Sequence, residues 1–84
     1  MLPLSQFKKC DVRALLRKGI EPFPAVRQAV DTVPPGKGLL LIAPFLPSPL
    51  IEKLRSEGFE SKVERSSGSD WIVYFWKAPG NSSL

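Results

Sequence analysis

The chain has 84 residues, which allow one domain, because a chain of this length buries only about 60–65% of its unfolded surface. It is 43% hydrophobic and 24% charged with a mean hydropathy of -0.04, a composition typical of a globular chain and not of a disordered or membrane protein. With one cysteine and no histidine, the chain has no internal disulfide and lacks the commonest zinc ligand and acid–base catalyst. We therefore expect no metal, no cofactor and no catalytic residues.

The location that the sequence predicts is cytoplasmic. No apolar run approaches the ~20 residues that span a bilayer. Residues 1–5 lack the basic and apolar regions of a signal peptide.

The first predicted element is a strand over residues 7–13, in which Cys10 and Val12 share one face and polar residues occupy the other. A helix should begin at about Pro22, because proline is tolerated in a first helical turn. Apolar residues then recur at helical spacing until Pro34-Pro35-Gly36, namely Val26, Ala29, Val30 and Val33.

The next elements are a strand over residues 39–43 and a second, short helix. The strand is a continuous apolar run, which is typical of a central strand covered on both sides. Ser48-Pro49 predicts the helix start, with Ser48 as N-cap, and Gly58 predicts its left-handed C-cap.

Two strands complete the prediction. Residues 60–65 alternate in polarity, residues 66–69 are turn formers, and residues 71–77 are rich in β-branched and aromatic side chains, a pattern that predicts a hairpin. Residues 79–84 have no periodic pattern and should form a flexible tail. The domain should therefore span residues 1–78.

The element order is β-α-β-α-β-β, which predicts an α+β fold. We expect a two-layer α/β sandwich with two helices on one face of a four-stranded mixed sheet. The two crossovers make the first three strands candidates for parallel pairing if they are adjacent, and periodicity does not determine adjacency.

Several short motifs identify a family resemblance. They are Asp11-Val12-Arg13, Pro22-Phe23-Pro24, the run from Val26 to Val30, and Pro35-Gly36 before an apolar strand. From about Cys10 to Lys77 the chain resembles the TusA/SirA-like sulfur-carrier superfamily, and within it an uncharacterised sister branch that shares the Asp-x-Arg start and a Pro-x-Pro-Leu motif, here Pro47 to Leu50. The resemblance implies a two-layer sandwich and a link to redox or sulfur metabolism.

The chain departs from this superfamily at two motifs. In the carriers, a Cys-Pro-x-Pro motif at the start of the first helix holds a persulfide, whereas this chain has Glu21-Pro22-Phe23-Pro24. A carboxylate accepts amide hydrogen bonds but carries no sulfur. The sister branch often has a His-Asp pair before its Pro-x-Pro-Leu motif, and Phe45-Leu46 stands here instead.

Cys10 is the candidate sulfur acceptor, because nearby bases such as Lys8 would favour a thiolate. The alternative, which its face-sharing with Val12 favours, is a small core residue with an unreactive thiol. Glu21 likewise has two interpretations, a partner contact or a helix cap.

The net charge of +4 is concentrated in residues 8–18, since the remainder of the chain holds seven bases and seven acids. This candidate basic patch consists of Lys8, Lys9, Arg13, Arg17 and Lys18. It could bind RNA phosphates, but no aromatic residue lies within it to stack on bases. A solvated edge or a steering surface for an acidic protein is the favoured interpretation.

Apolar residues supply the candidate interaction surfaces. Phe45 and Leu46 follow the central strand, at the end of the sheet where open α/β folds place their ligands. In the last predicted strand, residues 71–77, the side chains on both faces are apolar. The face with Tyr74 and Trp76 therefore has two interpretations. It either forms an interface with a partner protein or a second copy of the chain, or it lies at a sheet edge with the polar tips of these side chains in water.

Three hypotheses follow. The first is a non-enzymatic protein-interaction module that binds a protein partner through Glu21, Pro22, Phe23, Pro24, Phe45, Leu46, Tyr74 and Trp76. The second is a sulfur-relay protein that uses Cys10 as its persulfide carrier. The third is an RNA-binding module that uses the basic patch.

Overall fold

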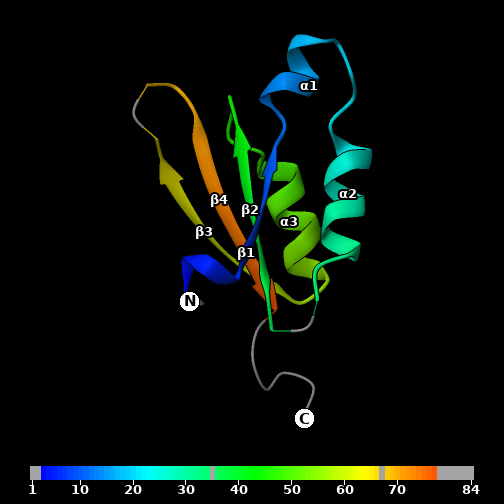
Figure 1. Cartoon of the computed structure of the whole chain (residues 1–84), viewed down its shortest axis with the longest axis vertical. Helices are drawn as coiled ribbons and strands as arrows, with labels where there is room; N and C mark the ends of the chain where they lie inside the picture. The colour runs from blue at the N-terminus through cyan, green and yellow to red at the C-terminus, as the bar shows by residue number, and fades with distance from the viewer. Residues whose placement is uncertain (1–2, 35, 67, 78–84) are drawn as a thin grey trace.

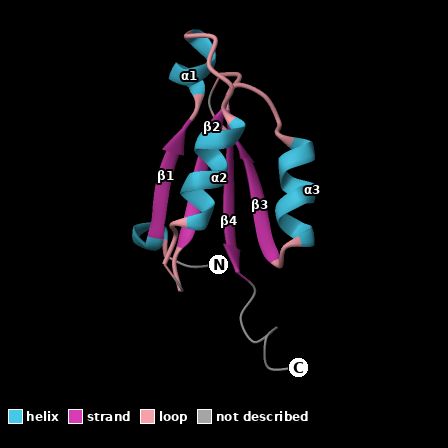
Figure 2. Cartoon of the chain, turned by 90° about the vertical axis from the view of Figure 1, so that its right-hand side faces the viewer, coloured by secondary structure: helices cyan, strands magenta, loops and turns pink. Residues whose placement is uncertain are grey.

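The computed structural model describes residues 3–34, 36–66 and 68–77. The predicted tail at 79–84, Pro35 of the helix-ending motif and Ser67 of the predicted turn lie outside these residues. Within them, two longer helices pack on one face of a four-stranded sheet, as Figures 1 and 2 show from two sides. The predicted fold class is confirmed.

The elements follow the predicted order with two short additions. They are a 3-10 turn η1 (Leu4–Gln6), β1 (Phe7–Asp11), α1 (Arg13–Arg17), α2 (Phe23–Asp31), β2 (Gly38–Ala43), α3 (Ser48–Ser56), β3 (Phe59–Arg65) and β4 (Trp71–Lys77).

The strand order in the sheet is β1-β2-β4-β3. β1 and β2 are parallel, and β4 is antiparallel to both β2 and β3, so the sheet is mixed and the predicted β3–β4 hairpin is confirmed. The third strand is not adjacent to the second, because β4 lies between them. Parallel pairing therefore stops at β1 and β2.

The core lies between the sheet and the helices. Leu39 and Leu41 of β2 and Val73 and Phe75 of β4 are almost fully buried there, and Leu54 of α3 covers them. Val26 and Val30 supply the buried side of α2, as their spacing predicts.

The boundaries of the helices differ from prediction by a few residues. α2 ends at Asp31, where Thr32 turns its hydroxyl back to the Gln28 carbonyl at 3.0 Å, so Val33 lies beyond the helix. Ser48 is the first residue of α3 and not its N-cap, which is Pro47. Gly58 has a φ of 95°, which confirms the predicted left-handed end.

The helix α1 was not predicted, and the strand over residues 7–13 is shorter than expected. β1 ends at Asp11, because the Asp11 carboxylate accepts the Arg13 backbone N–H at 3.0 Å and turns the chain into α1. The segment after the first strand is therefore helical over five residues.

The sheet face away from the helices, called the open face below, carries an aromatic cluster. The Phe7 ring meets Tyr74 at 5.3 Å and Trp76 at 6.4 Å between centroids, in edge-to-face geometry. Tyr74 is only 6% exposed, and β4 is a central strand. Of the two alternatives for Tyr74 and Trp76, the one that places them at a sheet edge is wrong, because β3 pairs on the outer side of β4 and the Phe7 ring from β1 packs against these residues.

Candidate functional site

An apolar pocket lies at the carboxyl ends of the two parallel strands, between the starts of α2 and α3. It encloses about 190 Å³. The residues that line it come from both helices, from β2 and from the segments that follow β1 and β2, and are Val12, Glu21, Pro22, Phe23, Val26, Leu41, Ala43, Phe45, Pro47, Pro49 and Leu50. This is the end of the sheet where α/β folds place ligands.

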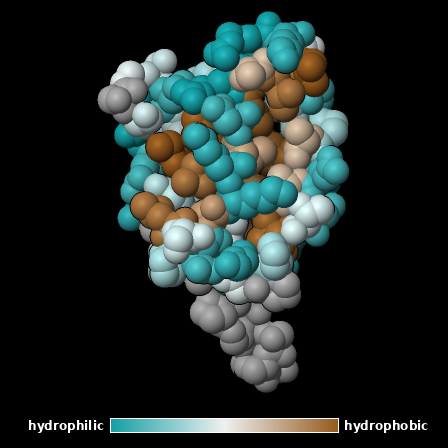
Figure 3. Space-filling model, viewed as in Figure 1, coloured by the Kyte–Doolittle hydropathy of each residue, from teal (hydrophilic) through white to brown (hydrophobic). Residues whose placement is uncertain are grey.

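Large apolar side chains are exposed around this pocket. Phe23 is 44% exposed and Phe45 is 45% exposed, and both line it. Leu46, next to Phe45, is 41% exposed. Elsewhere on the described surface, large exposed apolar residues are scattered singly, and Figure 3 shows separate brown patches between polar side chains on the face in view. Three of the six large apolar residues that are exposed in the described part of the chain therefore lie at or beside the pocket.

Glu21 is the one ionisable residue among those that line the pocket. Its Oε1 accepts the backbone N–H of Phe23 at 3.2 Å, so it caps the first turn of α2, as one of its two interpretations predicted. Pro22 and Pro24 restrict the backbone of this turn, in which the Phe23 side chain is exposed.

The structure divides the predicted interaction residues between two surfaces. Glu21, Pro22, Phe23 and Phe45 come together at the pocket, although Phe45 is 24 positions after Glu21 in the chain. Pro24 and Leu46 are exposed beside it without lining it. Tyr74 and Trp76 lie on the open face, away from the pocket.

Sequence reasoning did not nominate the lining residues that follow β1, that end or follow β2, or that begin α3. Pro47, Pro49 and Leu50 belong to the Pro-x-Pro-Leu motif that opens α3, so their position was predictable. Val12 directly follows β1 and Ala43 ends β2, and the rule that ligands bind at strand carboxyl ends could have nominated them once β1 and β2 were known to be neighbours.

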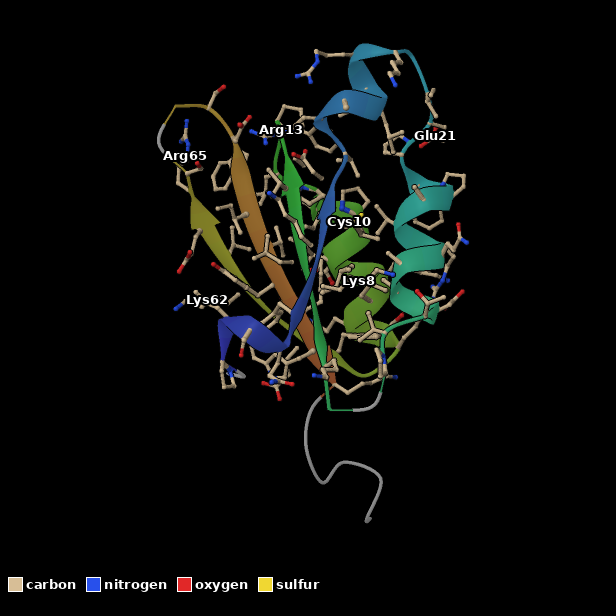
Figure 4. The ribbon with its side chains drawn as sticks, viewed as in Figure 1. Lys8, Cys10, Arg13, Glu21, Lys62 and Arg65 are labelled. Carbon is tan, nitrogen blue, oxygen red and sulfur yellow. The ribbon has the colours of Figure 1, made fainter. Side chains whose placement is uncertain are left out.

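Cys10 lies on the helix side of β1, between the strand and α2, and packs against the core (Figure 4). It is half-buried, so it packs beside the core without being the buried core residue that this interpretation expected. Burial raises the pKa of its thiol, Asp11 raises it further, and Lys8 opposes them. Cys10 is absent from the pocket lining, and Figure 4 shows it well apart from Glu21.

The structure does not bring the five bases of the predicted patch onto one surface. Lys8 points toward α2, where its Nζ lies 3.4 Å from the Thr32 hydroxyl, and Lys9 alternates to the open face. Arg13 is paired with Asp11 at 2.7 Å and with Asp70 at 2.6 Å. Arg17 and Lys18 end α1 without ion pairs in the described part of the chain.

A second cavity, of about 400 Å³, lies at the opposite ends of the two helices. Most of its charged groups contact one another: Arg27 contacts Asp31 at 2.7 Å and Glu57 at 2.9 Å, and Lys77 donates to the Glu57 carbonyl at 2.8 Å. Of the charged residues that line it, Lys37 has no such partner in the described part of the chain. Because most of these groups are satisfied within the chain, the apolar pocket is the stronger candidate site.

Among the described residues, no His, Cys, Asp and Glu side chains gather in threes at a distance that suits a metal ion. Within the same residues, every helix is too short or too polar to cross a membrane.

Comparison with known proteins gives one match. No curated protein and no solved structure matches the chain. The model of a family described as an uncharacterised conserved protein, DUF2249, matches residues 9–77. This range begins inside β1 and ends with the last residue of β4, so it covers nearly the whole sheet, both longer helices and every residue that lines the pocket. The chain therefore belongs to the DUF2249 family.

Proposed function

We propose that this chain is a non-enzymatic protein-interaction module of the TusA/SirA-like superfamily, which acts in the cytoplasm and binds a protein partner at the pocket between α2 and α3. The observation that carries the proposal is the concentration of exposed Phe23, Phe45 and Leu46 around one concave, apolar site. The motif resemblance adds that the start of the first long helix is the carriers' functional position, and it supports a role linked to redox or sulfur metabolism.

The size of the pocket favours a side chain as its occupant. Pockets that hold a whole small molecule enclose about 300–1,000 Å³. At about 190 Å³, this pocket suits one large apolar side chain of a partner protein. Such an anchor, buried in a pocket and surrounded by apolar contacts, is how protein interfaces concentrate their binding energy.

The two other hypotheses have less support. A sulfur relay needs an accessible thiolate, and burial stabilises the protonated form of Cys10. RNA binding needs phosphate contacts from grouped bases, whereas Lys8 and Lys9 point to opposite faces and Arg13 is neutralised by two carboxylates. Beside the aromatic cluster on the open face, Lys62 lies opposite Tyr74 and Glu60 lies opposite Trp76, so acids and bases alternate there and form no continuous basic surface.

Site-specific photo-crosslinking tests the proposal. Benzoylphenylalanine would replace Phe45 at the pocket in one variant and Val63 on β3, which is also 41% exposed, in a control variant. We expect position 45 to give a crosslinked product of discrete mass in cells that express the chain. Excess wild-type protein should suppress this product, and excess Phe23→Ser protein should not. Equal products from both positions, or none from position 45, would contradict the proposal.

A further inference from the structure

One acidic side chain at the pocket has no basic partner in the described part of the chain. Six of the eight acidic side chains form ion pairs with lysine or arginine, and the two that do not are Glu21 and Glu60. Glu60 lies on the edge strand β3, on the open face. Glu21 lines the pocket. In a chain with four more bases than acids, the carboxylate at the candidate site is left without a cation.

The chain contains bases that could have neutralised Glu21. Lys18 lies three residues earlier and Arg17 four residues earlier, yet neither reaches the carboxylate. The contact that Glu21 does make, with the Phe23 N–H through Oε1, occupies one lone pair and leaves Oε2 without a partner in the described part of the chain. Figure 4 shows Glu21 beside the loop that leads into α2, at the outer end of the helix.

From this we infer that the partner presents a large apolar side chain next to a lysine or arginine, with the apolar side chain in the pocket and the cation at Glu21. The inference rests on the proposed function and names the partner's chemistry at the same site. An apolar anchor supplies most of the affinity, and a charge at the rim selects among segments that carry such an anchor. A segment with an acidic residue at the same place would meet the Glu21 carboxylate and be rejected.

A library of random 12-residue peptides displayed on phage tests the inference. The wild-type chain, Phe45→Ser and Glu21→Gln would each be used for selection. Glutamine keeps the side-chain oxygen that accepts the Phe23 N–H, so the cap of α2 remains while the charge is removed. Glu60→Gln, the other unpaired carboxylate, is the matched control.

On the wild-type chain we expect enriched peptides to combine a large apolar residue with a neighbouring Lys or Arg. A synthetic peptide of the wild-type consensus should bind Glu21→Gln about two- to five-fold more weakly, the range of an exposed ion pair. Its affinity for the wild-type chain should fall as salt rises, and its affinity for Glu21→Gln should change less. Glu60→Gln should bind like the wild-type chain.

The outcomes separate the two proposals. Enriched peptides that require Phe45 but show no basic residue, or that bind Glu21→Gln unchanged, would overturn the inference and leave the proposed function standing. Peptides that bind Phe45→Ser as well as the wild-type chain, or no enrichment at all, would overturn both.

Discussion

At the scale of single residues, Arg13 connects parts of the chain that are far apart in sequence. Its guanidinium contacts Asp11 at the end of β1 and Asp70, which directly precedes β4 and is 57 positions further along the chain. These bonds lower the pKa of Asp11 to about 2, chiefly through the hydrogen bond from Arg13. A basic residue that the charge pattern assigned to a binding patch is therefore a structural tie between β1 and the β3–β4 hairpin.

Arg13→Gln should lower the thermal unfolding midpoint by a few degrees, because it removes both ion pairs. Arg17→Gln, which alters the same helix at a residue without an ion pair, should leave the midpoint within error. Thermal unfolding monitored by circular dichroism at pH 7 measures both. Equal effects of the two substitutions would contradict the assigned role.

The same pair predicts a pH dependence. Because the pKa of Asp11 is lower in the folded state than in the unfolded state, the stabilisation is complete above about pH 4 and is lost as the pH falls toward 2. The difference in midpoint between the wild-type chain and Arg13→Gln should therefore shrink over this range. A difference that stays constant from pH 7 to pH 2.5 would show that Asp11 is not the partner that matters.

Cys10 should be a slow nucleophile. Burial raises the pKa of its thiol, so at neutral pH the folded chain should react with Ellman's reagent more slowly than free cysteine, and unfolding in urea should remove the difference. Incubation with a cysteine desulfurase and free cysteine should leave the intact mass unchanged, with Cys10→Ser as control. One added sulfur atom on the wild-type chain and none on the control would favour the sulfur-relay hypothesis.

At the scale of elements, the packing of β1 beside β2 depends on a glycine. Gly38 of β2 lies beneath the aromatic ring of Phe7 from β1. A Cβ added at Gly38 would collide with the Phe7 ring and would come within 2.7 Å of the Phe75 carbonyl oxygen of the neighbouring strand. The absence of a side chain at Gly38 thus allows Phe7 to lie over β2 and cover Tyr74.

Gly38→Ala should destabilise the fold by about 1–3 kcal/mol, the usual cost of overpacking. The cost should be smaller in a Phe7→Ala background, where one of the two collisions is gone. Urea unfolding of the two single variants and the double variant measures this coupling. Equal costs in both backgrounds would mean that the ring is not the obstacle.

The elements also show which structure can be predicted from this sequence. The long apolar stripe of α2, the continuous apolar run of β2 and the hairpin of β3 and β4 were all predicted, because each carries a repeated pattern. α1 was missed because five residues are too few for a helical period to be recognised, and its start depends on a side-chain contact from Asp11. The strand order was not predictable, since pairing of β4 with β2 depends on packing between distant segments.

At the scale of the whole molecule, the candidate site was predicted in part. Glu21, Phe23 and Phe45 were nominated separately from local patterns, and the fold brings them together. Tyr74 was nominated on the same grounds but is covered by Phe7, a contact between strands that no local pattern contains. Exposure at a surface therefore depends on the strand order of the sheet, which local sequence patterns do not predict.

The position of β4 between β2 and β3 has a consequence for how the protein forms. The strand that joins the two halves of the sheet follows both of its neighbours in the chain, and until it has been synthesised, β2 and β3 have an empty place between them. Only the β1–β2 pair can form early, so most of the long-range pairing waits for residues 71–77. Until residues 71–77 have been synthesised, the nascent chain thus exposes the inner edges of β3 and of the apolar strand β2, and its dependence on chaperones should be greatest just before β4 emerges.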